Sequence, residues 1–286
     1  MRRSRAPDEL GTLAGMHPIP VRKMSFDLPT ADDLDPRWLG DDTLRSYLTS
    51  ALSLYVHWLE PFLVQSLRRV RGRIRDATLR EDLDRFCSQE AQHYGQHQKA
   101  NQAILGRGYP GLLPRFEQLE QEFRSWLDRK DDRWRVGFAE GFEAYTTRAA
   151  IEGLESGLLD HRRTDPRLGA LFKWHLAEEI EHRTVAFDVY QHLYGDYLFR
   201  VKMCWVAQWH LWRFCMDCTR IMSDWDRERL DASYGVSRAL RWGATLSRLP
   251  HFFATYLPTY TPHSLKVPEA SLALSEQLSK QARAVR

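Results

Sequence analysis

Two segments far apart in the sequence carry the same short pattern, a Glu followed three residues later by a His. The first is FCSQEAQHYGQHQKAN at residues 86–101, and the second is WHLAEEIEHRTVAFDVY at residues 174–190. Each has one further His a helical turn from the pair. The residues are Glu90, His93 and His97 in the first segment, and His175, Glu179 and His182 in the second. On a helix of 3.6 residues per turn each set lies in one narrow arc, so each segment predicts a helix with three metal-binding groups on one face.

A carboxylate lies one helical hairpin upstream of each Glu-x-x-His segment. In ferritin-like di-iron and di-manganese proteins, two such motifs combine with one Glu from each of two further helices. Here Glu60 stands 30 residues before Glu90, and Glu143 stands 36 residues before Glu179. Each separation accommodates a descending helix, a turn and a rising helix. We therefore choose Glu60 and Glu143 as the two further carboxylates, with Glu140 in reserve for Glu143.

The environment of Glu60 allows more than one interpretation because Pro61 follows it. A proline inside a helix removes a backbone hydrogen bond and kinks the helix. Either a helix restarts at Pro61, or a helix bends there beside a bound ligand. A third interpretation places Glu60 at a helix boundary facing solvent, since a buried carboxylate is costly unless it is paired or bound to metal.

The sequence thus predicts a metal site of four carboxylates and two imidazoles. The predicted ligands are Glu60, Glu90, His93, Glu143, Glu179 and His182, and the additional candidates are His175 and His97, which either bind metal or orient a carboxylate. This set would hold two divalent metal ions, with iron as the first choice and manganese or zinc as alternatives. No residue is assigned a catalytic role beyond metal binding. The alternative is a helical bundle whose inward polar stripe forms only hydrogen bonds.

Helical periodicity over most of the chain predicts an all-α fold, a ferritin-like four-helix bundle with additional C-terminal helices. Residues 1–40 are rich in proline and are expected to form an arm over the body. Residues 41–195 are expected to form the di-metal bundle, with one helix running from Pro166 to Gly195. Residues 196–257 are expected to form C-terminal helices packed on the bundle, and residues 258–286 a polar tail.

The segment after residue 196 is unusually rich in tryptophan. Trp205, Trp209 and Trp212 are interleaved with charged and polar residues, so the segment is not an uninterrupted membrane span. We expect a buried helix that packs on the bundle. An interfacial helix that touches a membrane, or one wall of an apolar substrate tunnel, stays open as an alternative. Cys215 and Cys218 form a lone C-x-x-C, which without a second pair does not predict a zinc site.

Composition limits the classes of partner. The chain has 286 residues, of which 43% are apolar, and its net charge of +3 arises from 41 basic and 38 acidic residues. This near balance predicts no nucleic-acid binding. Four Cys without a secretory signal at Met1 predict free thiols and a cytoplasmic protein. We expect a small-molecule substrate and no peripheral membrane contact, and a homodimer stays open.

At these segments the sequence resembles the ferritin-like family of predicted metal-dependent hydrolases. The resemblance extends from about Val21 into the C-terminal region and covers VRKMSFDL, ALSLYVHWLEPF, GFEAYTT and the two Glu-x-x-His segments. It implies a di-metal carboxylate site on the residues named above, with His97 and His175 as extra polar groups near it. The family pattern usually has Gly before the first Glu, where this chain has Leu59. The position of His175 is also similar to that of a third iron-binding histidine in di-iron arylamine N-oxygenases.

Three functions follow as hypotheses. The first is a di-iron oxidoreductase that activates dioxygen and acts on an apolar or aromatic small molecule, because mixed Glu and His ligation suits iron. The alternative is a metal-dependent hydrolase that uses a metal-bound water. The third is a metal-binding helical protein without enzymatic activity. Gln89 and Glu178, each next to a predicted ligand Glu, are candidate partners for the His of the opposite helix.

Overall fold

The computed structural model of the protein describes residues 18–284, and within that range every regular element is helical. The all-α class predicted from the sequence is confirmed. The α-helices are α1 (Thr43–Val70), α2 (Ala77–Gly106), α3 (Leu112–Arg129), α4 (Asp132–Glu155), α5 (Pro166–Glu181), α6 (Val185–Leu193), α7 (Tyr197–Arg229), α8 (Arg238–Thr255) and α9 (Glu269–Ala284). Short 3₁₀ turns are η2 (Arg71–Arg73), η3 (Leu158–Asp160), η4 (Ala232–Tyr234) and η5 (Pro262–Ser264).

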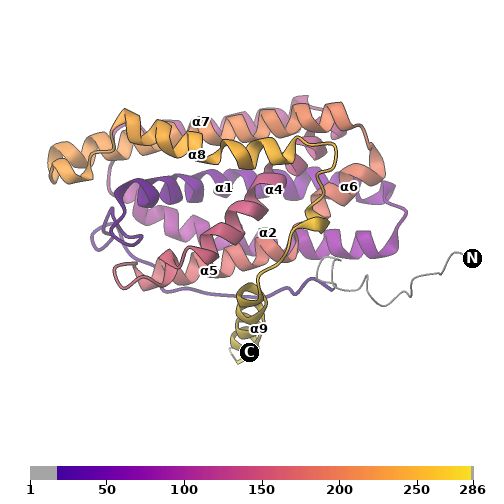
Figure 1. The fold of residues 1–286 in the computed structure, drawn as a ribbon, viewed down its shortest axis with the longest axis horizontal. Coiled ribbons are helices and arrows are strands. Elements are labelled where there is room, and N and C mark those ends of the chain that lie inside the picture. The colour runs from indigo at the N-terminus through magenta and orange to yellow at the C-terminus, as the bar shows by residue number, and fades with distance from the viewer. Residues whose placement is uncertain (1–17, 285–286) are drawn as a thin grey trace, which may run out of the picture.

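Helices α1, α2, α4 and α5 pack together and carry the predicted ligands, with α7 lying against α1 and α4 (Figure 1). The four helices begin at capping aspartates. The side chains of Asp42, Asp76, Asp131 and Asp165 accept hydrogen bonds from backbone N–H groups of the first turns of α1, α2, α4 and α5. The buried apolar side chains of these helices form one contiguous core, to which α3 and α7 also contribute. The four-part division of the chain made from the sequence stays a prediction.

Helix α1 runs without interruption through Pro61. Of the interpretations left open for Glu60, a helix restart and a solvent-facing boundary both disagree with the structure. The side chain of Glu60 is buried in the middle of the helix, on the face that meets α2 and α5. Pro61 occupies a position where the missing N–H costs one hydrogen bond, and the packing of α1 compensates for that loss.

The helix expected from Pro166 to Gly195 is instead two helices. Helix α5 ends at Glu181, and His182 departs from helical geometry with φ −96° and ψ 7°. The guanidinium of the buried Arg183 donates to the carbonyl of Ile180, one of the acceptors that a helix leaves unpaired at its end. This break places His182 at the C-terminal cap of α5, and α6 then continues the chain.

Helix α7 packs closely on α4 because Gly141 lacks a side chain. A Cβ at Gly141 would lie 2.7 Å from the Cα of Cys204, so the two helix backbones meet here. The amide of Gln208 donates to the Gly141 carbonyl across the same contact. All four cysteines of the chain are buried free thiols, as the sequence predicts.

The polypeptide before α1 and after α8 also packs on the bundle. Residues 18–42 run over α2 and α5, and Arg22 is buried. Where the sequence predicts a polar tail, the structure has α9, which contacts α5 and lies on the opposite side of the bundle from α7 and α8 (Figure 1). Residues 1–17 of the predicted arm lie outside the described range. Among residues 18–284 no helix is both long and apolar enough to cross a membrane.

Candidate metal centre

The side chains predicted to bind metal come together between four helices. Helix α1 contributes Glu60; α2 contributes Glu90, His93 and His97; α4 contributes Glu143; α5 contributes His175 and Glu179, with His182 at its C-terminal cap. All eight are buried. Their donor atoms form four overlapping groups of three, each lying within 4.8 Å: Glu90, Glu143 and His182; Glu60, Glu90 and His93; His93, His175 and Glu179; Glu60, His97 and His175.

His182 lies at one end of this cluster. Its Nε2 is 3.4 Å from a carboxylate oxygen of Glu90, 3.5 Å from one of Glu143 and 3.7 Å from one of Glu179. Three carboxylates from three helices therefore converge on a single imidazole nitrogen. The break after α5 makes this possible, because it frees His182 from the helical path.

His93 and His175 lie at the other end. The Nδ1 of His93 is 3.7 Å from Glu90 and 4.0 Å from Glu179. The Nε2 of His175 is 3.2 Å from the same oxygen of Glu179, and its Nδ1 is 4.0 Å from Glu60. The rings of His93 and His175 stack with their centroids 4.3 Å apart. Glu90 and Glu179 thus contact both ends of the cluster.

Donor atoms that face the centre of the cluster lack hydrogen-bond partners. They are both carboxylate oxygens of Glu60 and Glu143, one each of Glu90 and Glu179, Nδ1 of His93 and Nε2 of His182. Buried polar atoms are nearly always hydrogen-bonded, because an unpaired one costs about 1–3 kcal/mol. Here they converge in one place and belong to the residue types that bind divalent metals. The residues therefore fit a metal centre.

The outward nitrogens of two imidazoles are held by neighbouring side chains. The Nε2 of His93 is 3.1 Å from Glu178, and the Nδ1 of His182 is 2.9 Å from the amide oxygen of Gln89. Each partner lies on the opposite helix, as the sequence predicts for Gln89 and Glu178. When the outward nitrogen donates, the inward nitrogen has a lone pair for metal.

A buried arginine from the N-terminal segment supports these partners, and residue spacing does not predict it. Arg22 donates to Glu178 at 2.9 Å and to Glu181 at 2.7 Å, and the indole of Trp174 also donates to Glu178. Arg22 is 156 residues from Glu178 in the chain, and no spacing rule connects such distant residues. Arg22 lies within the VRKMSFDL segment. The resemblance of that segment to a known family was the only indication in the sequence that the segment matters.

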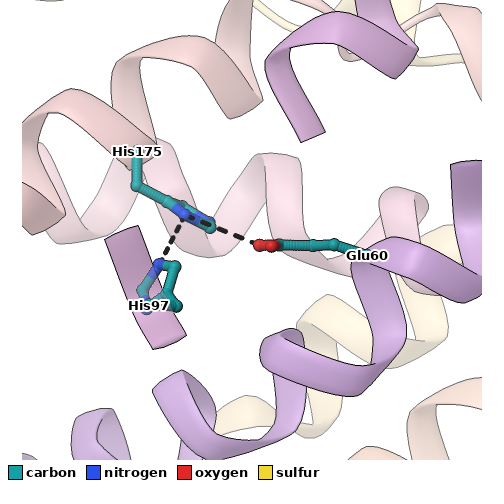
Figure 2. Close-up of side chains that lie close together, drawn as sticks. All are labelled: Glu60, His97 and His175. Carbon is teal, nitrogen blue, oxygen red and sulfur yellow. Dashed lines mark hydrogen bonds and ion pairs between the residues drawn. The ribbon is translucent and has the colours of Figure 1, made fainter. Parts of the chain in front are cut away.

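His97 lies one step outside the inner cluster. Its Nε2 is 2.8 Å from Nδ1 of His175 (Figure 2). Its Nδ1 is 2.8 Å from the hydroxyl of Ser53. The hydroxyl of Ser53 donates to Asn101. Because both ring nitrogens of His97 have partners, its contact with the cluster passes through His175. The sequence did not predict the roles of Ser53 and Asn101.

Glu140, the reserve candidate for Glu143, lies outside the cluster. Its carboxylate accepts a hydrogen bond from Arg200 at 3.1 Å and contacts the thiol of Cys204 at 3.3 Å. By contrast, no Lys or Arg forms an ion pair with Glu60, Glu90, Glu143 or Glu179 within the described part of the chain. Within residues 18–284 the ion-pair partners of the four inner carboxylates are therefore histidines.

Burial and mutual repulsion shift the titration of this cluster. Burial, reinforced by Glu90, raises the pKa of Glu60 well above its ordinary value, and burial raises the pKa of Glu143 to about 7. Burial acts to raise the pKa of Glu179 as well, but the adjacent His182 holds it well below its ordinary value. Burial lowers the pKa of His93. A centre of this kind favours bound cations, which replace the missing positive charge.

A cavity of about 750 Å³ reaches the cluster from the surface between α1, α4, α5, α7 and α8. Its inner end is lined by His175 and Glu179, and its walls are mainly apolar. The apolar lining residues include Leu48, Leu52, Val56, Phe172, Leu211 and Phe252. Arg45 and Ser247, which are exposed, lie at its rim. The cavity therefore gives a molecule with an apolar portion access to one side of the inner carboxylates.

Comparison with known proteins gives one match. The family model described as predicted metal-dependent hydrolase matches residues 20–265. No curated protein matches the chain. No solved structure matches it either, so the likeness to ferritin-like bundles stays a prediction. The matched range includes the whole inner cluster, Arg22 and the residues that line the cavity. This chain belongs to the family of predicted metal-dependent hydrolases.

Proposed function

We propose that the protein is a metal-dependent hydrolase whose active centre is a pair of divalent metal ions held in the cluster between α1, α2, α4 and α5. The observation that carries the proposal is the set of unpaired, buried donor atoms that face one another. Glu90, Glu143 and His182 would hold one ion, and His93, His175 and Glu179, with Glu60 beside them, would hold the other. Glu90 and Glu179, which contact both ends, would be shared. Divalent ions in such a centre lower the pKa of water and supply a nucleophile near neutral pH.

The surrounding side chains prepare the donors. Glu178 and Gln89 fix His93 and His182 so that an imidazole lone pair faces inward. His97 does the same for His175, because its Nε2 contacts Nδ1 of His175 and leaves Nε2 facing Glu179. A donor arrangement that is locked before metal arrives loses little conformational freedom on binding.

The cavity indicates the kind of substrate. An apolar wall with charged residues at the rim suits a small molecule that has an apolar or aromatic portion and a polar end. Because His175 and Glu179 line the inner end, the scissile bond would approach the metal pair from the His175 side. The burial of the cluster on its other sides keeps bulk water from the remaining carboxylates.

A second candidate function is oxygen activation by a di-iron form of the same centre. The observation that favours it is the donor set itself, in which four carboxylates and at least two imidazoles lie in a buried, apolar environment. Such a set is typical of di-iron carboxylate proteins. Both functions use the same residues and differ in the metal and in the reaction.

Reconstitution separates the two functions. The protein is stripped with a chelator and loaded with Zn²⁺ or, under nitrogen, with Fe²⁺, and its metal content is measured. Each form is then assayed with p-nitrophenyl esters of increasing acyl length and for oxygen uptake. We expect two ions per chain and ester hydrolysis with redox-inert Zn²⁺, both lost in Glu143→Gln and retained in Glu155→Gln, whose side chain is exposed on the same helix.

The outcomes that contradict the proposal are distinct. Oxygen uptake by the iron form, with no hydrolysis by any form, would favour the second candidate. Binding of less than one ion per chain would reject both functions and leave a helical protein with an internal polar network.

A further inference from the structure

One face of the molecule, formed by α7 and α8, carries a row of four neighbouring tryptophans, of which Trp205, Trp209 and Trp242 are exposed and Trp212 is half-buried. Trp205 is 56% exposed and Trp242 is 47% exposed. The ring centroids are 5.8 Å apart between Trp205 and Trp209, 4.7 Å between Trp209 and Trp212, and 5.9 Å between Trp212 and Trp242. The row starts on α7 and crosses to α8. We call the surface of these four residues together with Leu246 and Phe253 the tryptophan face.

Helix α8 turns an apolar side outward. Leu246 and Phe253 are each 59% exposed, and together with Trp242 they repeat at helical spacing along the helix. A surface helix of a globular protein normally turns its apolar stripe toward the core and its polar side to solvent. In α8 the opposite side lines the cavity through Gly243, Ala244 and Phe252. Trp242 contacts the ring of Trp212 and Phe253 contacts that of Tyr256, but the outward apolar side as a whole stays exposed.

The two helices hold this surface together as one face. They run side by side along one long edge of the molecule (Figure 1). At one end the indole of Trp212 donates to the hydroxyl of Thr245, and at the other the hydroxyl of Tyr197 donates to the carbonyl of Tyr256. Arg200, which is buried, also donates to the carbonyl of Thr255. These contacts fix the outward side chains of α7 and α8 relative to each other.

The unpaired charges of α7 and α8 beside the tryptophan face are basic. Residues 197–216 and 236–257 contain no Asp or Glu, and their basic residues are Arg200, Lys202, Arg213, Arg238, Arg241 and Arg248. Arg200 is buried and pairs with Glu140, and Arg248 pairs with Glu152 of α4. Lys202, Arg213 and Arg238 are exposed, and none of the three forms an ion pair within residues 18–284. On α7 the outward positions 198, 202, 205, 209 and 213 carry three apolar and two basic side chains. This surface thus combines aromatic, aliphatic and cationic groups without a carboxylate.

We propose that the tryptophan face docks on the surface of an anionic lipid bilayer. Tryptophan is the side chain that prefers the boundary between headgroups and acyl chains, because its ring is apolar and its N–H is polar. Exposed Lys and Arg beside it attract anionic headgroups. An amphipathic helix with this composition lies in the plane of the interface. The mode fits a chain in which no described helix can span a membrane.

Docking in this orientation would also place the cavity near lipid. Leu240 and Ser247 of α8 are exposed and line the cavity, so its rim lies on the same helix as the outward apolar side. If the proposed function holds, an amphipathic substrate dissolved in the bilayer would enter beside α8. This consequence rests on the proposed function, whereas docking itself does not.

Vesicle binding tests the proposal without any measurement of activity. The full-length protein is mixed with vesicles of phosphatidylcholine alone or with 30% phosphatidylglycerol, and binding is followed by flotation and by the blue shift of tryptophan fluorescence. We expect binding to anionic vesicles that weakens in 0.5 M NaCl. Lys202→Gln and Arg213→Gln are each expected to weaken it about fivefold, the effect of one basic residue near an anionic surface. Trp242→Ser and Leu246→Asp are expected to abolish flotation.

The matched control is Leu113→Asp. Leu113 is 51% exposed, like the residues of the tryptophan face, but it lies on α3. We expect this variant to bind vesicles as the unchanged protein does. Absence of binding to anionic vesicles would overturn the proposal, and so would equal loss of binding in Leu113→Asp. A dimer that Leu246→Asp dissociates, without vesicle binding, would overturn it in favour of a second copy of the chain.

Discussion

Replacing Glu143 with Gln is expected to stabilise the metal-free protein while it weakens metal binding. Burial raises the pKa of Glu143 from 4.5 to about 7. The folded state therefore binds the proton more tightly than the unfolded state does. The contribution of this carboxyl to stability is fully present below pH 4.5 and is lost as the pH rises through 7. At 1.36 kcal/mol per pKa unit, the loss at pH 8 is about 3 kcal/mol.

Glutamine does not ionise, so the variant escapes this loss. We expect metal-free Glu143→Gln to exceed the unchanged protein in free energy of unfolding by up to about 3 kcal/mol at pH 8, and by less than about 0.5 kcal/mol at pH 4.5. The measurement is urea denaturation of chelator-treated protein at both pH values. Glu155→Gln, an exposed substitution on the same helix, is the control and is expected to change stability by no more than about 0.5 kcal/mol.

Bound metal is expected to make the unchanged protein more stable than Glu143→Gln. Saturating metal stabilises the unchanged protein by about 2.7 kcal/mol at one hundred times its dissociation constant, and we expect the variant to gain much less because a ligand is missing. Two results would refute the reasoning. One is an equal stability of the two metal-free proteins at pH 8. The other is a stability difference that does not change with pH, since a packing effect would not follow the titration of a carboxyl.

Two further predictions concern residues around the centre. Arg22→Leu leaves Glu178 and Glu181 buried without their cation, so urea denaturation should show a decrease of about 3 kcal/mol in the free energy of unfolding. The control is Arg45→Leu at an exposed position, for which we expect a decrease below about 1 kcal/mol. A decrease this small in Arg22→Leu would contradict the prediction. Burial lowers the pKa of His57 to about 4. The neutral imidazole therefore contributes to the stability of the folded state fully above pH 6.5, and this contribution is lost as the pH falls toward 4. After allowing for partial solvent screening, the loss in free energy of unfolding is about 2 kcal/mol. His57→Phe should remove this part of the destabilisation by acid. If the free energy of unfolding of the variant depends on pH as that of the unchanged protein does, the prediction is wrong.

The sequence predicts which of these side chains share a helix face because that geometry is local, and the structure brings the predicted side chains together; that they bind metal stays a prediction. Three residues spaced by three and four positions share a helix face whatever the rest of the chain does. The choice of Glu143 over Glu140 came from the separation between motifs, and the structure puts only Glu143 in the cluster, while Glu140 pairs with Arg200. The helices themselves followed from periodicity, which is also a property of neighbouring positions.

What the sequence could not predict depends on contacts between distant segments. The break after Glu181 was missed because the apolar periodicity continues through it, and only the packing of Arg183 and His182 shows why the helix ends. Helix α9 was missed because its sequence is largely polar. Its buried side includes Ser275, which with Ser279 accepts hydrogen bonds from Arg22. The face of α7 was also ambiguous, since tryptophans at helical spacing fit a core as well as a surface.

The arm, α9 and the centre are connected through one arginine. Arg22 contacts Glu178 and Glu181 on α5 and Ser275 and Ser279 on α9. Glu178 in turn holds His93, so the tautomer of that imidazole depends on a segment that precedes the bundle. Two buried carboxylates beside four more would repel strongly, and Arg22 is the cation that lets Glu178 stay close to the centre. The terminal segments thus set the charge balance outside the cluster, which leaves the inner carboxylates to be balanced by metal.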